Sequence, residues 1–281
     1  MMTTPSATRR ITLCQVQELL TVLRQNVRFA SHQGGPASPI ISKLTSLLSL
    51  VRSTSDAEFG SISRLDLVAP FLDVVKSEET SADGTGAALT ALATLLDFGV
   101  ISEAFPQAQE AMSELVDAVT TARFELTDPR FDEVVKMQII EVLQSSVCGS
   151  SGHLLGDESV WDSVQTCFVN RNQVVHSWTL CHRAERGLFM IVRAVFARFA
   201  VLVAEQEEGG DGKQEVGEEA EQEADQGKAG IAALPPPVPI TRSARASSQA
   251  PGCYGLPCAV KIFNFLCSQL LREAVRTDTA A

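Results

Sequence analysis

The residues with the greatest chemical potential are Cys181 and its neighbour His182, with Asp162 earlier in the chain. An imidazole beside a thiol can take the thiol's proton and make the sulfur a nucleophile. Adjacent residues on a helix, however, point in different directions, so these two side chains cannot easily share a proton. We therefore expect no catalytic residue in this chain.

Histidine, cysteine and tryptophan show no pattern of a metal or cofactor site. His153, His176 and His182 lack partners at ligand spacing, and we interpret them as surface or capping residues. Trp161 and Trp178 are interpreted as core or helix-packing residues rather than a cofactor stack. No cysteine pair has the C-x-x-C spacing of a zinc site, which predicts free thiols, no metal and no cofactor. The seven cysteines are at positions 14, 148, 167, 181, 253, 258 and 267.

The charge of the chain is concentrated in one segment. The formal net charge is −11 over 281 residues, and between Glu205 and Lys228 ten acidic residues against two lysines contribute −8 of it. The remainder is nearly neutral, so it offers no broad basic footprint for nucleic acid. With 45% hydrophobic and 20% charged residues, the composition is that of a globular protein with a sizeable core.

Apolar residues recur at intervals of three and four along most of the chain, which predicts helices and no strands. The predicted helices cover about 12–29, 39–52, 66–77, 86–98, 112–119, 135–143, 156–170, 187–204 and 257–274. Periodic segments end near Phe98, Leu143 and Phe199, at intervals of roughly 45 to 55 residues, near the roughly 40–47 of armadillo and HEAT repeats. The predicted fold is an all-α, armadillo/HEAT-like helical solenoid, with a compact irregular bundle as the alternative.

Three residues indicate helix ends. Pro129 cannot sit inside a helix, so it separates the helices on either side of it. Gly99 follows Leu95 and Leu96 in the position of a C-terminal cap. Asp157 precedes an apolar segment in the position of an N-cap.

The segment from Gly187 to Ala204 is the strongest candidate for a membrane helix. Arg193 and Arg198 interrupt it, and each would cost about 2.5–3.5 kcal/mol at the centre of a spanning helix. We interpret it as a buried protein helix that lays a wide apolar stripe into the core. That stripe comprises Leu188, Ile191, Val192, Val195, Phe196, Phe199 and Leu202.

The composition changes after Ala204. An acidic run is followed by the proline-rich segment 234–239 and a small polar segment, which predicts a disordered acidic, then Pro/Ser-rich linker over residues 205–252. The proline run favours an extended polyproline conformation. We expect it to act as a spacer, with a docking ligand for an aromatic groove as the alternative.

Residues 118–143 read AVTTARFELTDPRFDEVVKMQIIEVL. They resemble the motif of the dimerisation and cyclophilin-binding (DCB) domain of large Golgi Arf guanine-nucleotide exchange factors, in the brefeldin-A-resistance and GNOM-like branch of the Sec-seven family. Residues 71–101 and 184–199 are similar to further segments of that domain. The resemblance covers roughly residues 10–204, and implies a DCB-like helical domain over 1–204 with no active site of its own.

A second resemblance lies after the linker. Residues 254–266 are similar to the first helix of the family's next module, the homology-upstream-of-exchange-domain segment, which we place at 253–281 as a truncated start. The family's Asn-aromatic-Asp-Cys box and its exchange domain with the catalytic glutamate are absent from this sequence. We expect a fragment or truncated product that is not an enzyme.

The resemblance implies a regulatory and dimerisation module in Golgi vesicle trafficking, cytoplasmic and peripherally associated with Golgi membranes. The implied partners are a second copy, the homology-upstream module, and cyclophilin-type or Golgi Rab/Arf-family proteins. Nucleic acid is not among them. The alternative from the periodicity alone is an unrelated helical-repeat adaptor that binds peptides or partner helices.

Four polar residues match the family motif: Arg123, Asp128, Asp132 and Glu133. They could form a binding surface, but we prefer a structural role. Asp128 can begin a turn before Pro129, and acidic residues at 132 and 133 suit a helix N-terminus. Arg123 suits the negative end of the preceding helix.

Overall fold

In a computed structural model, the protein is described over residues 5–30, 39–123, 129–173, 177–210 and 253–278. These residues form helices and contain no β-strand, which confirms the all-α prediction. The helices are α1 Pro5–Ala30, α2 Pro39–Ser53, α3 Asp56–Phe59, α4 Arg64–Lys76, α5 Ala82–Asp97, α6 Ala108–Thr120, α7 Pro129–Cys148, the 3-10 helix η1 Gly152–Leu154, α8 Asp157–Asn172, α9 Trp178–Gly210 and α10 Leu256–Asp278.

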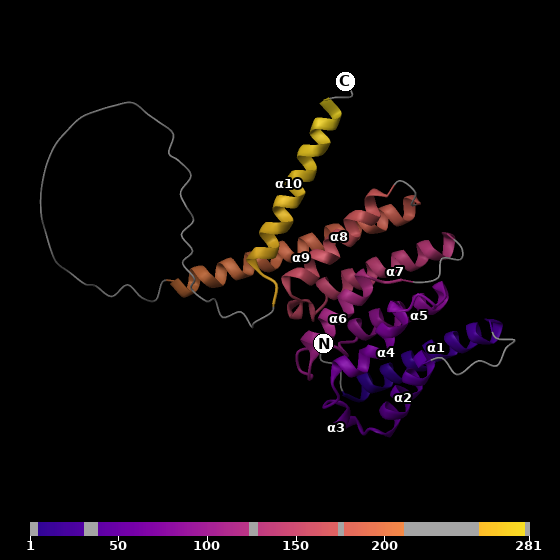
Figure 1. The fold of residues 1–281 in the computed structure, drawn as a ribbon. Helices are drawn as coiled ribbons and strands as arrows, with labels where there is room; N and C mark the ends of the chain where they lie inside the picture. Colours follow the sequence, from indigo (N-terminus) through magenta and orange to yellow (C-terminus); the bar gives the residue numbers. More distant parts are fainter. Residues whose placement is uncertain (1–4, 31–38, 124–128, 174–176, 211–252, 279–281) are drawn as a thin grey trace, which may run out of the picture.

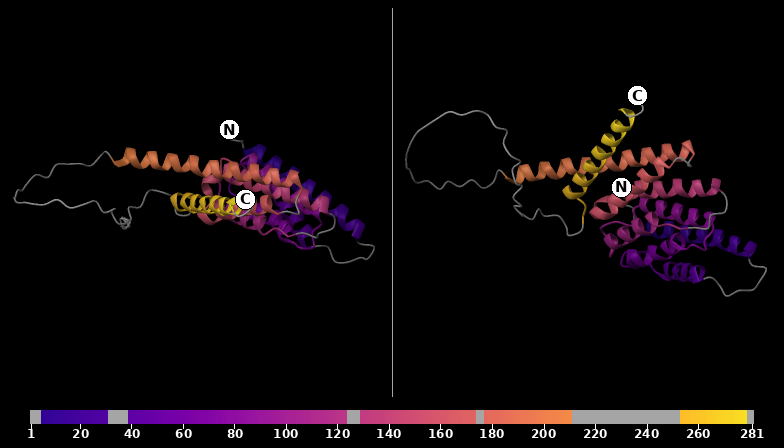
Figure 2. Two further views of the ribbon diagram at one scale, coloured as in Figure 1. Left: turned by 90° about the horizontal axis from the view of Figure 1, so that it is seen from above. Right: turned by 45° about the horizontal axis from the view of Figure 1, so that its top comes forward.

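The helices stack in two layers (Figures 1 and 2). In one layer α1, α5, α7 and α9 contact one another in that order, and in the other α2, α4, α6 and α8 do the same. Contacts between α1 and α2, α4 and α5, α6 and α7, and α8 and α9 join the layers into successive pairs. This order is that of a helical solenoid, as predicted, and not that of an irregular bundle.

The core lies between the two layers and consists mainly of Leu, Val and Ala. Phe71 from α4, Leu89 from α5, Leu115 from α6 and Leu143 from α7 are fully buried. Each helix pair has apolar residues on two sides, so it cannot bury them without a neighbour. The stack is therefore held together by contacts between successive pairs.

Two of the three predicted helix ends are confirmed. Gly99 has the left-handed φ of 65°, and its N–H donates to the Leu96 carbonyl while the next N–H donates to the Leu95 carbonyl over 2.9 Å. This is the hydrogen-bond pattern of a glycine-terminated helix. Pro129 is the first residue of α7, where its missing N–H costs nothing.

The prediction for Asp157 is wrong. The N-cap of α8 is Gly156, which has extended backbone and no side chain to offer, and Asp157 is the first residue of the helix. Its Oδ1 atom instead accepts a hydrogen bond from the Gly255 N–H over 2.9 Å. The carboxylate thus ties α8 to the segment before α10.

Helix α3 was missed because four residues are too short for periodicity to show. Its signal is a capping box: the Ser55 hydroxyl accepts from the Glu58 N–H, and the Glu58 carboxylate accepts from the Ser55 N–H. This S-x-x-E pattern is visible in the sequence.

Helix α9 differs from its prediction in extent and in burial. It runs from Trp178 to Gly210 rather than from 187 to 204. Residues Trp178–Ala204 are long and apolar enough to cross a membrane, but only 17% of the 18-residue apolar window within them is buried. Ile191 and Val195 are buried, whereas the rest of the predicted wide stripe is only partly covered. The stripe packs on the core as predicted, but the interpretation of the helix as buried is wrong, because α9 ends its layer and has α7 as its one neighbour there.

Several sequence predictions concern residues outside the described part. The disordered linker predicted for 205–252 lies there for 211–252, as does the proline run. The prediction is wrong for 205–210, because these residues continue helix α9. His176 and Asp128 also lie outside the described residues.

A buried arginine at the start of α4 was not foreseen. Arg64 is fully buried, and its guanidinium carbon lies 3.8 Å from the ring centroid of Phe105 and 4.8 Å from that of Phe59. Its Nη2 donates to the Phe59 carbonyl over 3.0 Å, while Nε and Nη1 have no partner among the described residues. Burial lowers the pKa of Arg64 to about 10. Arg64 therefore interacts as much by packing between the two rings as by hydrogen bonding.

This packing predicts different effects for two substitutions. Arg64→Ala removes the stem between the two rings and should lower the free energy of unfolding by about 2–4 kcal/mol. Arg64→Met keeps most of the volume and removes a charge that no carboxylate balances, so it should change stability by less than about 1 kcal/mol. Urea unfolding followed by circular dichroism measures both. Equal losses for the two variants would show that the charge, not the packing, is what matters.

Candidate interaction surface

The residues considered for nucleophilic catalysis are not brought together. The His182 ring stacks on Trp178, with ring centroids 5.1 Å apart and planes at 5°. Asp162 lies on α8, where burial and the nearby charge of Glu158 raise its pKa and Lys261 lowers it. Neither arrangement activates the Cys181 thiol.

The predictions for the other histidine and for the tryptophans have mixed outcomes. His153 is at the surface, with Nδ1 2.8 Å from the Ser150 carbonyl and Nε2 2.9 Å from Glu103 Oε2. Trp161 packs between helices, as predicted. Trp178 is 78% exposed, so its interpretation as a core or packing residue is wrong. Among the described residues, no group of three or more His, Cys, Asp or Glu could hold a metal ion.

Glu133 has a structural role, but at the start of α9 rather than at the start of its own helix α7 as predicted. Its Oε1 accepts the Ser177 N–H over 2.7 Å, and the Ser177 hydroxyl accepts the Leu180 N–H over 3.3 Å. Together they satisfy donors at the start of α9, which a helix needs there. The family-like acidic residue of α7 thus fixes where α9 begins.

Arg123 departs from the expected role, whereas Asp132 lies in the first turn of α7, as predicted. Arg123 pairs with Glu78, 2.5 Å away after α4, rather than with the end of α6, and both side chains are mostly exposed. Such a pair contributes little to stability. Asp132 is buried, and its Oδ1 has no partner among the described residues.

Outside the stack, an interface is formed where α10 packs on α8 and α9. The Tyr254 N–H donates to the Leu155 carbonyl over 2.7 Å, and the Gly255 N–H donates to Asp157 as described above. These two bonds fix the chain in register just before α10 begins. We call Leu155, Asp157, Trp161, Phe168 and Arg198 the docking surface.

The side chains of the α10 segment fill this surface. Tyr254 is 4% exposed, with the Arg198 guanidinium 4.3 Å from its ring centroid. Cys258 and Ile262 are fully buried. Phe265 meets two aromatic rings edge-on, at 5.3 Å from Trp161 and 4.9 Å from Phe168.

Lys261 completes the contact from the polar side. Its Nζ lies 4.6 Å from the Trp161 ring centroid and 3.5 Å from Glu158 Oε2. Beyond these contacts α10 leaves the stack (Figure 1), and Leu271 is 69% exposed. The docking surface therefore binds the first half of an amphipathic helix.

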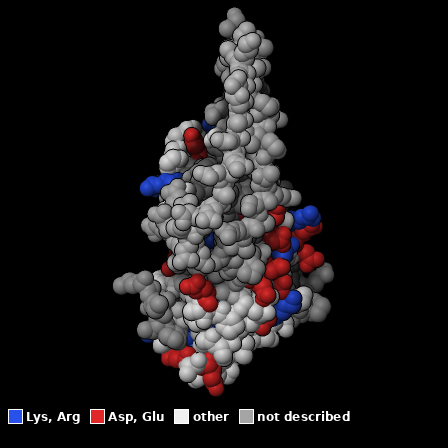
Figure 3. All heavy atoms as spheres, turned by 90° about the vertical axis from the view of Figure 1, so that its left-hand side faces the viewer, with Lys and Arg blue, Asp and Glu red and all other residues white. Residues whose placement is uncertain are grey.

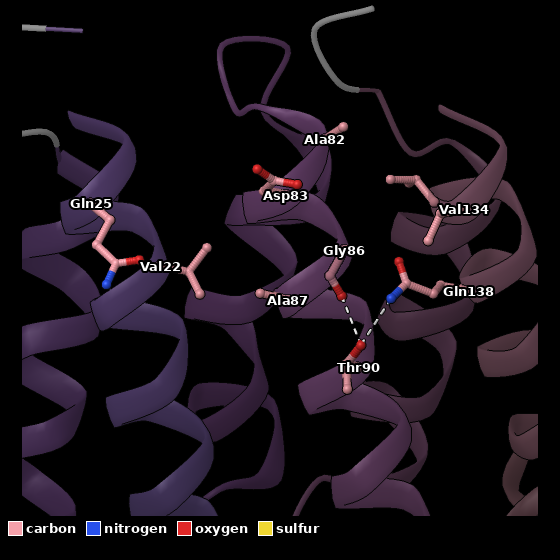
Figure 4. A pocket seen from close by; sticks show the side chains of 10 residues that line it. Val22, Gln25, Ala82, Asp83, Gly86, Ala87, Thr90, Val134 and Gln138 are labelled. Atoms are coloured by element: carbon pink, nitrogen blue, oxygen red, sulfur yellow. Dashed lines mark hydrogen bonds between the residues drawn. The ribbon is translucent and has the colours of Figure 1, made fainter. Parts of the chain in front are cut away.

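Apart from the docking surface, a hollow lies between α1, α5 and α7 (Figure 4). It encloses about 420 Å³, and Asp83 is the one charged residue that lines it. Gln138 Nε2 donates to the Thr90 hydroxyl over 3.1 Å, and that hydroxyl donates to the Gly86 carbonyl over 3.0 Å. Its lining holds no cysteine or histidine.

Acidic side chains gather on one side of the stack, with few basic ones between them (Figure 3). On α6, Glu114 and Asp117 both bind Lys76, at 3.2 and 3.0 Å. Asp117 also contributes to the raised pKa of Asp162 on α8, so the two helices bring their acids close together.

Stacked helix pairs that hold an apolar segment at one end define a helical-repeat interaction module. No family model matches the sequence. The chain is 31% identical to the ARF guanine-nucleotide exchange factor GNOM of Arabidopsis thaliana over 65% of its length, and 30% identical to the exchange factor GNL2 of the same plant over 72%. It is 30% identical over 59% to the Golgi-specific brefeldin A-resistance guanine nucleotide exchange factor 1 homolog of Caenorhabditis elegans.

The chain is thus a homologue of large Arf guanine-nucleotide exchange factors, and the predicted resemblance is confirmed. It spans 8–13% of the length of the curated relatives that it matches. Six of these seven relatives are exchange factors by name, which speaks against an unrelated adaptor.

The docking surface predicts a change in tryptophan fluorescence. Phe265→Ala removes two edge contacts, worth about 0.5–1.5 kcal/mol each, and should loosen α10 from Trp161. In a Trp178→Phe background, where Trp161 is the reporter, its emission should shift to the red. Phe263→Ala is the matched control, since Phe263 is 56% exposed on the same helix. An equal shift in both variants would mean that α10 does not dock as described.

Alkaline pH should loosen the same contact. Burial, and secondarily the charge of Asp157, raises the pKa of Cys258 to about 12 from an ordinary 9.0. The folded state favours the neutral thiol, so its stabilising effect is complete below pH 9 and is lost as pH rises toward 12. By pH 10 the loss should be about 1.4 kcal/mol.

The measurement is Trp161 emission between pH 7.5 and 10, again in the Trp178→Phe background. Cys258→Ala lacks the titrating thiol and should show a smaller shift over this range. Cys167, whose pKa burial also raises to about 12, stays in both proteins. Identical pH profiles would remove Cys258 as the cause.

Proposed function

We propose that this chain is a non-catalytic regulatory and self-association module of a large Arf guanine-nucleotide exchange factor that acts in Golgi vesicle trafficking. Most of the relatives are exchange factors by name, and the name of one of them calls it Golgi-specific. The described helices form a surface for binding helices and bring no nucleophile, base or metal ligands together. Both observations support a module that binds rather than reacts.

The observation that carries the proposal is the α10 segment seated on α8 and α9. Residues 254–266 resemble the start of the homology-upstream module, and they dock through Tyr254, Cys258, Ile262 and Phe265. In this proposal the helical domain, which extends to the end of α9 at Gly210, recognises the upstream module across a linker of residues 211–252. The segment 253–281 is the beginning of that module.

The same proposal places the protein in the cytoplasm, peripherally bound to Golgi membranes. Its partners are a second copy, the parent exchange factor, and cyclophilin-type or Golgi Rab/Arf-family proteins. Contact between the helical domain and the upstream module positions or restrains the exchange domain of the parent.

Two solution measurements on the purified 281-residue chain test this function. Multi-angle light scattering at micromolar concentration should show a dimer or larger assembly. Release of labelled GDP from an Arf GTPase should not be accelerated by the chain at any concentration. A strict monomer would remove the self-association role, and a clear acceleration of GDP release would overturn the non-catalytic assignment.

A further inference from the structure

Helix α9 has one side that nothing in the described structure covers. Its inner side carries Leu180, Ala184, Ile191 and Val195, which are buried where α9 packs on α7 and α8. Yet only 17% of the 18-residue apolar window within Trp178–Ala204 is buried. An apolar helix this exposed is unusual in a monomer, since large exposed apolar surfaces mark interaction sites.

The exposed residues form a line along the helix. Trp178, His182, Arg186, Phe189 and Arg193 follow one another at intervals of three or four residues, which puts them on one face. Trp178 is 78% and Phe189 63% exposed, and the three others are exposed as well. We call these five residues the α9 outer stripe.

The line continues toward the C-terminal end of the helix with small side chains. Ala197, Ala200 and Ala204 fall on the same face and are exposed. These small side chains make this part of the helix surface flat, without a groove or a protruding side chain.

The stripe is aromatic and basic. No ion pair is formed by Arg186 or Arg193 with any described residue, whereas Arg183, one turn from the stripe's start, binds Glu141 at 3.3 Å. Glu185 is exposed beside the stripe and is its one acidic neighbour on α9 up to Ala204. Two uncompensated arginines against one glutamate leave the face positive, in a chain of net charge −11.

We propose that the α9 outer stripe is a binding surface for an anionic lipid membrane. Tryptophan and phenylalanine rings insert at the headgroup level, and arginines bind lipid phosphates beside them. The inner side of α9 is committed to α7 and α8, so the helix lies along the membrane surface and does not cross it. A straight, convex face suits a deformable partner of this kind, because it offers no pocket to a rigid one.

The positive charge of this face favours an anionic membrane, rather than a second copy of the chain, as its partner. The stripe has no apolar groove into which a copy could insert an anchor, and protein interfaces depend on such anchors. Anionic lipids supply phosphate and carboxylate groups along the whole line. The inference deepens the proposed peripheral attachment and rests on it only for its location in the cell.

Vesicle flotation of the full 281-residue chain tests the proposal. The chain should bind vesicles of phosphatidylcholine mixed with phosphatidylserine and should not bind phosphatidylcholine alone. Each basic residue near an anionic surface contributes about five-fold in affinity, so Arg186→Glu combined with Arg193→Glu should weaken binding at least about 25-fold. Phe189→Ser should weaken it without changing the preference for the anionic lipid.

Leu50→Ser is the matched control, since Leu50 is an apolar side chain of α2, 46% exposed at the other end of the stack. It should bind as the unsubstituted chain does. Circular dichroism melting confirms that each variant is folded.

Two results would overturn the proposal. The first is that the folded double variant binds vesicles as well as the unsubstituted chain does, or that neither protein binds them. The other is a loss of self-association in light scattering with vesicle binding unchanged, which would make the stripe an interface between copies. Vesicle flotation uses only the chain and lipid, so it tests the lipid-binding surface separately from the proposed function. A monomer that binds vesicles would contradict the proposed self-association but not the proposed lipid-binding surface.

Discussion

The structure depends on one constraint: each helix pair of the stack has two apolar sides and must be covered on both. Within the stack the next pair supplies the cover, so Leu89 of α5 and Leu143 of α7 lose all contact with water. At the last pair the cover is incomplete. The first half of α10 covers part of α8 and α9, and the outer side of α9 is left open.

Close approach between α7 and α9 meets this constraint at one residue. A Cβ atom on Gly187 would lie 2.7 Å from Ile140 Cγ2, which is closer than real Cβ atoms come. The absence of a side chain thus lets α9 reach α7, and Glu133 fixes its start. The position of α9 in turn places Arg198 against Tyr254, so the α10 docking surface exists only when α9 is correctly seated.

Much of this architecture was predictable because it repeats a simple pattern. Apolar spacing identified the long helices, and Pro129 and Gly99 marked ends whose backbone chemistry is local. The failures concern residues whose partners are distant in sequence. Asp157 pairs with Gly255, and nothing near Asp157 in the chain announces that contact. Arg64 is buried between two phenyl rings, which no propensity of arginine would suggest.

The burial of α9 was mispredicted for a related reason. Its sequence carries apolar residues around most of its circumference, and a sequence alone does not tell how many neighbours a helix has. The position at the end of a layer decides it. Trp178, interpreted as a packing residue from its type, is exposed for the same reason.

We propose above all that the helical stack binds the segment that follows it. Hydrogen exchange of the full chain is the most direct test of this binding. We expect the amides of Tyr254, Gly255 and Ala259 to exchange as slowly as those of α8, because each of them donates a hydrogen bond at or beside the docking surface. Exchange of these amides as fast as in an unfolded peptide would contradict it.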